Sequence, residues 1–174
     1  MPGPTLAFVV PWFGDEVRGG AELQAWETAR ELSSSGCRVE ILTTCSRSFL
    51  HRWDEDFHPP GESEREGVTV RRFPVDRRDE ARFGAATRAL HGRGRPTEAV
   101  ERDFVAENIN SRALYRYIAE YAERYLFVFT PYLYGTTLAG AAVRPDRSLL
   151  IPCLHDEPYA YLEATRRTFL GERG

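Results

Sequence analysis

The sequence predicts an α/β fold with a Rossmann-like, open and mainly parallel sheet flanked by helices. Short apolar runs of about four to six residues alternate with stretches of helical periodicity along the chain. The first run, residues 6–11, is continuously apolar, as in strands that are buried on both faces of a parallel sheet. A helix and a second strand follow at once, which indicates a right-handed βαβ unit.

This first βαβ unit has the clearest boundaries. Residues 6–11 predict a strand, 12–20 a loop and 21–34 a helix, whose apolar positions recur about every 3.6 residues. Gly36 occupies the position that usually follows a helix C-terminus. Residues 38–43 then predict the second strand, so the two strands are expected to be parallel neighbours.

The remaining elements continue the alternation. Residues 44–66 are polar and contain Pro59-Pro60-Gly61, so they predict a loop. From Thr97, an apolar stripe predicts one long helix that reaches Tyr121. No repeat or boundary interrupts the pattern, and residues 1–174 are expected to form one domain. The other predicted elements are strands at 68–73, 125–130 and 149–154, and helices at 80–90, at 134–142 and from about 159.

The composition is that of an ordinary globular protein, with 42% hydrophobic and 28% charged residues. The formal net charge of −3 gives no general attraction to nucleic acid, and no nucleic-acid partner is expected. No apolar run approaches the ~20 residues of a membrane span. The N-terminal residues lack the basic region of a signal peptide, so we expect a cytoplasmic protein.

The basic residues and the cysteines limit the reactions that this chain could catalyse. All 23 basic residues are arginine. P-loop NTPases, protein kinases and pyridoxal phosphate enzymes each need a particular lysine, so this chain alone cannot perform those reactions. The cysteines at positions 37, 45 and 153 are odd in number and lack C-x-x-C spacing, which favours reduced thiols.

A pair of glycines precedes the first helix. In open α/β sheets, ligands bind beyond the carboxyl ends of the strands, where the loops 12–20, 131–137 and 155–158 are expected. Gly19 and Gly20 would let backbone N–H groups approach an anion such as a diphosphate, which the helix dipole also favours. The alternative is a tight turn into the helix. The G-x-G-x-x-G fingerprint is absent, so NAD or FAD is not expected.

The same region carries a family resemblance. The loop closes in Arg18-Gly19-Gly20-Ala21-Glu22, and the helix contains Ala29-Arg30-Glu31-Leu32 before Gly36 and the strand 39–44. This pattern resembles the N-terminal domain of family 4 glycosyltransferases, which are retaining enzymes with a GT-B fold. The resemblance covers residues 5–45 and returns at 125–160, with Cys37 and Arg38 in place of the usual His-x. It implies that Gly19 and Gly20 lie beside the donor diphosphate and that Glu22 caps or orients the loop.

Two strand-end loops supply further candidates for the site. His155 follows a predicted strand, and the resemblance implies a catalytic position near the donor sugar; the alternative is a strand-end histidine that bonds to backbone. Asp156 and Glu157 could bind acceptor hydroxyls or cap the next helix. Tyr132, Tyr134 and Thr136 are acceptor-binding candidates on the preceding strand-end loop, or packing residues. The tyrosines at 117, 121 and 125 are expected in the core instead.

The resemblance implies half of an enzyme. In the GT-B fold the nucleotide sits mostly on a C-terminal domain, which these 174 residues do not contain. We therefore expect an acceptor-binding N-terminal half, inactive alone, of an enzyme that transfers sugar with retention from a nucleotide-sugar donor to a glycan, glycolipid or small-molecule acceptor. No cofactor or metal is implied. The alternatives are a stand-alone Rossmann-like binding or regulatory module, and half of a sugar-nucleotide epimerase.

Two charged segments have competing interpretations. Asp54-Glu55-Asp56 is similar to the metal-binding D-x-D of GT-A enzymes, but it lies away from any predicted strand end, and no metal site is expected. Residues 65–95 hold nine arginines against four acidic residues. They could contact a lipid-linked acceptor or an anionic membrane, giving a peripheral membrane contact, or form a solvated insertion.

Overall fold

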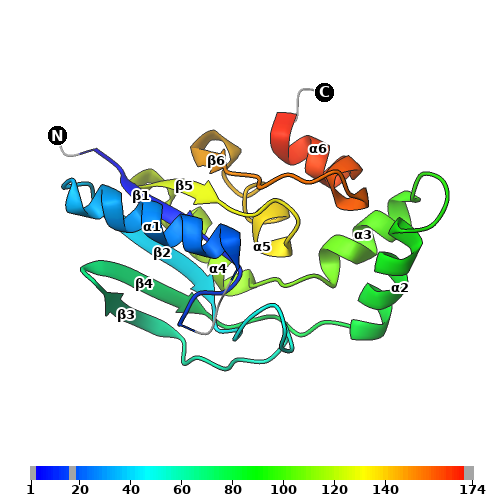
Figure 1. Ribbon diagram of the computed structural model, residues 1–174, viewed down its shortest axis with the longest axis horizontal. Coiled ribbons are helices and arrows are strands. Elements are labelled where there is room, and N and C mark those ends of the chain that lie inside the picture. The colour runs from blue at the N-terminus through cyan, green and yellow to red at the C-terminus, as the bar shows by residue number, and fades with distance from the viewer. Residues whose placement is uncertain (1–2, 16–18, 171–174) are drawn as a thin grey trace.

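The computed structural model describes residues 3–15 and 19–170, and within them it contains a six-stranded sheet of order β3-β4-β2-β1-β5-β6 (Figure 1). Every pairing is parallel except that of β3 with β4. The predicted Rossmann-like α/β class is therefore confirmed. The strands are β1 (Thr5–Val9), β2 (Val39–Thr44), β3 (Gly61–Arg65), β4 (Val68–Phe73), β5 (Tyr125–Phe129) and β6 (Ser148–Leu150).

Helices cover both faces of the sheet. Helix α1 (Gly20–Ser34) packs on one face, where its Trp26 joins Phe8 and Val10 of the first strand and its continuation. Helix α4 (Arg112–Tyr121) packs on the other face against Ala7 and Val9. Neighbouring residues of β1 thus point to opposite cores, which explains its continuous apolar run.

The prediction of a loop over 44–66 was wrong at its end, where β3 forms an antiparallel edge strand. Its sequence, Gly61-Glu62-Ser63-Glu64-Arg65, is polar because the strand is exposed at the sheet margin, where charge also opposes pairing with other chains. Glu66 and Gly67 have φ of 47° and 80° and form the turn into β4. A two-residue turn with positive φ at both positions is the usual connection of a tight hairpin.

The predicted long helix is two helices, α3 (Glu98–Ala106) and α4. Residues 107–111 interrupt it, and the hydroxyl of Ser111 caps α4 by accepting from the N–H of Leu114 at 3.2 Å. Short polar side chains compete with the helix for backbone hydrogen bonds, which is why the Asn108-Ile109-Asn110-Ser111 sequence ends one helix and begins another.

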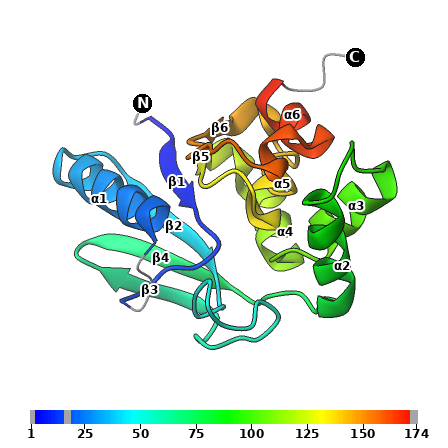
Figure 2. The same cartoon turned by 45° about the vertical axis from the view of Figure 1, so that its right-hand side comes forward.

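A second, smaller core lies beside the sheet (Figure 2). It joins α2 (Glu80–Leu90), α3 and α5 (Gly135–Leu138) to Leu162, the residue that precedes α6 (Glu163–Leu170), and we call it the side core. Helix α5 and strand β6 are shorter than the predicted 134–142 and 149–154, and a 3-10 turn, η3 (Pro158–Tyr161), precedes α6. Two further 3-10 turns are η1 (Ala122–Arg124) and η2 (Pro145–Arg147). The buried residues of the side core are Ala86, Leu90, Phe104, Leu138 and Leu162.

The strand order fixes where a ligand would sit. From β1 the chain proceeds to β2 and β4 on one side, and later to β5 and β6 on the other. The carboxyl ends of β1 and β5 therefore mark the topological switch point, where open α/β sheets bind ligands. None of the helices over the described residues is long and apolar enough to cross a membrane.

Candidate functional site

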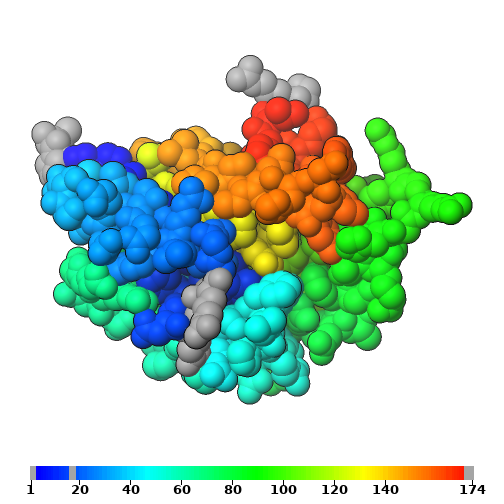
Figure 3. All heavy atoms as spheres, in the orientation of Figure 1, coloured from blue at the N-terminus to red at the C-terminus, as the bar shows by residue number. Residues whose placement is uncertain are grey.

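Three chain segments meet at the carboxyl ends of β1, β5 and β6. The backbone N–H of Thr130 donates to the carbonyl of Val9 at 3.1 Å, which extends the pairing of β5 with β1. The Cys153 thiol, after β6, lies 3.7 Å from both the Thr130 hydroxyl and the Gln24 side-chain oxygen of α1. The segments after β5 and β6 therefore adjoin the N-terminal part of α1 (Figure 3).

The two glycines at the start of α1 have different surroundings. Gly19 is the N-cap residue, and a Cβ there would collide with the carboxylate of Glu22, which folds back over it. Gly20 is exposed, and a Cβ there would meet no atom of the described residues within 4 Å. Gly19 thus accommodates Glu22, while Gly20 leaves the helix N-terminus open to solvent. Arg18, which belongs to the same motif, lies outside the described residues.

Glu22 is a buried carboxylate in the first turn of α1, with 7% of its surface exposed. Burial raises its pKa, while hydrogen bonds from its own backbone N–H and from Trp12 oppose that rise. The first turn of a helix lacks intrahelical acceptors for its N–H groups, and an acidic side chain there also interacts well with the helix dipole. The buried Glu22 carboxylate therefore stabilises the first turn of α1.

Tyr132 and Glu157 join the segments after β5 and β6. The hydroxyl of Tyr132, a fully buried side chain, donates to Glu157 Oε1 at 2.6 Å. Burial and the adjacent carboxylate raise the pKa of Tyr132, so the phenol remains protonated. The backbone N–H of Tyr132 also donates to the carbonyl of Pro152 at 3.1 Å.

Tyr134 belongs to an aromatic cluster with Trp12 and Trp53, two residues that the sequence did not indicate as part of the site. Its ring lies 4.8 Å from that of Trp12 and 5.8 Å from that of Trp53, centroid to centroid. Burial raises the pKa of Tyr134, as do the charges of Glu22 and Glu157. Both carboxylates are therefore close enough to act on one buried phenol. The apolar Pro11-Trp12-Phe13 sequence after the first strand was the available signal for Trp12.

The other predicted site residues are placed differently. Thr136 is enclosed within α5, and its hydroxyl has no hydrogen-bond partner. Asp156 accepts from the hydroxyl of Tyr161 at 2.7 Å on the surface, where it raises the pKa of Tyr161. His155 is exposed, and its backbone carbonyl accepts from Glu157 N–H at 3.0 Å. Across the described residues, its imidazole makes no hydrogen bond or ion pair.

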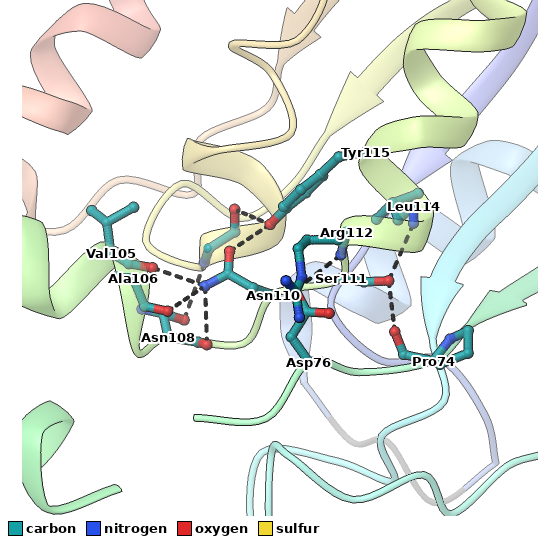
Figure 4. A network of polar contacts seen from close by, with 11 residues as sticks. Pro74, Asp76, Val105, Ala106, Asn108, Asn110, Ser111, Arg112, Leu114 and Tyr115 are labelled. Atoms are coloured by element: carbon teal, nitrogen blue, oxygen red, sulfur yellow. Dashed lines mark hydrogen bonds and ion pairs between the residues drawn. The ribbon is translucent and has the colours of Figure 1, made fainter. Parts of the chain in front are cut away.

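The segment after β5 is held from below by two asparagines (Figure 4). Asn108 Oδ1 accepts from the N–H of Gly135 at 3.1 Å, and its amide donates to the carbonyl of Leu133 at 3.3 Å. The Tyr115 hydroxyl donates towards Asn110 Oδ1 at 2.5 Å and the Gly135 carbonyl at 3.0 Å. A Cβ at Gly135 would collide with Asn110, so the close approach requires glycine here.

The arginine-rich stretch 65–95 includes β4 and α2 and is not simply a solvated insertion. The Arg71 guanidinium pairs with Glu40 and Glu62. That of Arg78 lies 4.8 Å from the ring centroids of both Trp53 and Phe83, and burial lowers its pKa. The arginines of this stretch that remain exposed at or beside α2 are Arg77, Arg82, Arg88, Arg93 and Arg95.

The acidic triplet 54–56 has local partners. Asp54 pairs with Arg52 at 3.0 Å, which lowers the pKa of Asp54. Asp56 accepts from the backbone N–H of Val75 at 2.8 Å. Over residues 3–15 and 19–170, no group of three or more His, Cys, Asp or Glu side chains is arranged to hold a metal ion.

The sheet order defines a Rossmann-like domain, and folds of this kind bind ligands at the topological switch point. Residues 19–173 match the family model of the glycosyl transferase 4-like domain, and the chain belongs to that family. The resemblance identified from the sequence is thereby confirmed, and the chain is a glycosyltransferase-type module. No curated protein and no solved structure matches it.

Proposed function

We propose that this domain is the acceptor-binding half of a glycosyltransferase that transfers a sugar, with retention, from a nucleotide-sugar donor. One observation carries the proposal: the exposed start of α1 at Gly20 and the Tyr132–Glu157 pair lie near the carboxyl ends of neighbouring strands, at the switch point of a family 4-like domain. A helix N-terminus favours an anion, and the half-buried Glu157 carboxylate can accept hydrogen bonds from sugar hydroxyls.

The donor diphosphate would approach α1 at Gly20. This residue is exposed and has no side chain, so phosphate oxygens could reach the backbone N–H groups of the first turn. Glu22 would keep those groups in place from the protein side. The helix N-terminus would stabilise the leaving diphosphate electrostatically, a role that requires neither lysine nor a metal ion.

The acceptor would meet the segments after β5 and β6. Glu157 accepts one hydrogen bond from Tyr132, and a carboxylate has capacity for more. His155 and Asp156 are exposed beside it and can reach a bound sugar without displacing core side chains. We assign these groups to positioning and charge stabilisation, and none of them to nucleophilic attack. The acceptor hydroxyl would attack on the face that the diphosphate leaves, and the diphosphate would take up its proton.

The proposal extends to partners and location. A C-terminal domain would supply most of the nucleotide contacts. The domain would act in the cytoplasm. The exposed Arg88 in the last turn of α2, with Arg93 and Arg95 in the connection between α2 and α3, would support a peripheral contact with anionic lipid. This connection stands out from the surface in Figure 3.

The test uses the complete encoded polypeptide with a panel of nucleotide sugars and glycan, glycolipid and small-molecule acceptors. We expect release of nucleoside diphosphate that depends on acceptor, and a product with the anomeric configuration of the donor. His155→Ala should lower kcat by at least about tenfold. His51→Ala is the matched control, because the His51 imidazole bonds to Ser48 within its own loop at 2.8 Å.

Other outcomes would identify the alternatives. Conversion of the nucleotide sugar to an isomer without acceptor would indicate an epimerase. Binding of a small molecule with no turnover of any donor would indicate a regulatory module. Activity within a few-fold of wild type in His155→Ala would remove His155 from the catalytic centre.

A further inference from the structure

A hollow of about 340 Å³ lies on the α1 face of the sheet, and the residues that line it differ from those that follow β5 and β6. It is bordered by residues 13–15 after β1, by His58, and by the strands β3 and β4. Arg72, near the carboxyl end of β4, and Arg65, at the end of β3, bring two guanidinium groups to it.

Arg72 is a half-buried cation without a carboxylate partner in the described part of the chain. Its Nη2 donates to the carbonyl of Phe13 at 2.8 Å, and its Nη1 donates to the hydroxyl of Ser63 at 3.2 Å. Its Nε is buried and finds no hydrogen-bond partner among residues 3–15 and 19–170. Burial lowers the pKa of Arg72, and the charge of Arg65 lowers it further. A guanidinium has five N–H donors, so Arg72 retains donors beyond these two bonds.

The charge of the second guanidinium, that of Arg65, is only weakly neutralised by its acidic neighbours. Arg65 pairs with Asp15 at 2.8 Å, but the Asp15 side chain is 89% exposed, and solvent screens such a pair strongly. Arg65 also lies over the rings of Phe13 and Trp26, at 5.4 and 4.9 Å from their centroids. Glu64, the other acidic residue at the hollow, is exposed on β3.

We propose that this hollow binds a phosphate group, with the Nη groups of Arg72 as donors and Arg65 as a second cation. A buried charge is costly without a counter-charge, and a phosphate oxyanion would supply one. Guanidinium groups form strong, charge-assisted hydrogen bonds to phosphate oxygens. The volume exceeds that of inorganic phosphate and admits the phosphomonoester of a monosaccharide. This site does not depend on the proposed transfer reaction.

The test follows the arginine Nε–Hε and backbone amide signals of the purified chain by NMR. Inorganic phosphate and glucose 1-phosphate are titrated at constant ionic strength, with chloride as the reference anion. We expect saturable shifts at Arg72 Nε–Hε and at the amides of Ser63 and Gly14, and none with chloride. Tighter binding of glucose 1-phosphate than of phosphate would identify a sugar phosphate as the ligand, and equal binding would identify free phosphate.

Arg72→Gln should weaken phosphate binding at least about tenfold, and Arg65→Gln by a smaller factor. Arg71→Gln is the matched control, because Arg71 is the preceding residue of the same strand and pairs with Glu40 and Glu62, away from the hollow. Unchanged thermal melting of each variant shows that it is folded. The proposal is overturned if phosphate and chloride shift the same signals equally, or if folded Arg65→Gln and Arg72→Gln bind phosphate as the wild type does.

Discussion

Glu22 is a single residue whose buried carboxylate stabilises the start of α1. The carboxylate lies over Gly19 and is enclosed, with Trp12 and the Glu22 N–H as donors. Burial outweighs these donors, so the folded protein holds the proton of Glu22 more tightly than the unfolded chain does. The cost of keeping this carboxylate ionised should therefore appear in the pH dependence of stability.

Glu22→Gln should become more stabilising, relative to wild type, as pH rises. A raised pKa contributes stability below the ordinary value of 4.5, and this contribution is lost as pH rises through the folded-state pKa. Urea denaturation of both proteins between about pH 4 and pH 7 measures the difference. Glu31→Gln, on the exposed side of the same helix, should leave the difference flat. A constant difference for Glu22→Gln would contradict the raised pKa.

Tyr132→Phe should destabilise the domain by about 1–2 kcal/mol, because it removes a buried hydroxyl that donates to Glu157. Tyr161→Phe is the matched control, since it removes a hydroxyl-to-carboxylate bond of 2.7 Å on the surface. That change should cost less than about 0.5 kcal/mol. Chemical denaturation gives both values, and equal losses would show that the Tyr132 bond gains nothing from burial.

Backbone position alone was enough to place some of the candidate site residues. The glycines and Glu22 are defined by their place before a helix, and Glu157 by its place after a strand. For Thr136 the sequence left acceptor contact and packing open, because its enclosure depends on how α5 packs between neighbouring helices. Trp12 and Trp53 come together from separate loops, which periodicity does not reveal.

At the scale of elements, regular apolar patterns located β4 and α2 with the observed bounds, Val68–Phe73 and Glu80–Leu90. Strand β3 and the break between α3 and α4 were not predicted, because both depend on contacts with other elements. Strand β3 has no buried face to impose alternation and is held by pairing with β4. The break between α3 and α4 depends on two asparagine side chains: Asn110 donates to the carbonyl of Val105 at the end of α3, and Asn108 accepts from the N–H of Gly135 in α5.

Asn108→Ala should loosen the segment after β5 and cost about 1–3 kcal/mol, because the N–H of Gly135 and the N–H of Ile109 both lose their acceptor. Hydrogen exchange at Gly135 should accelerate more than exchange in β1. Thr97→Ala, which removes a cap of α3 from the exposed side, is the control. It should leave Gly135 exchange unchanged. Equal protection of Gly135 in Asn108→Ala and wild type would exclude this anchoring role.

The whole molecule joins a sheet core with two packed faces to the side core of α2, α3 and α5. Cys45 follows β2, is fully buried, and has its pKa raised by burial to about 12. Cys37, in contrast, is exposed before the same strand. The chain therefore carries one thiol outside and one inside at opposite ends of a central strand.

Alkylation at pH 8 should modify Cys37 rapidly and Cys45 at least about a thousandfold more slowly, because the thiolate is the reactive form and Cys45 is both buried and protonated. Peptide mass spectrometry measures both rates. In denaturant the two rates should converge, so Cys45 reports opening of the sheet. Cys37→Ser should leave the rate at Cys45 unchanged. Comparable rates in the native protein would mean that β2 opens locally.

The side core has a consequence for divergence within the family. The stretch from α2 to α3 packs mainly in the side core and is followed by Asn108, which bonds to Gly135, while the strands on either side of it are fixed by the sheet. Replacement of this stretch can therefore change the surface beside the sheet and leave the strand register intact. Exchange of this stretch between relatives should alter that surface without rebuilding the fold.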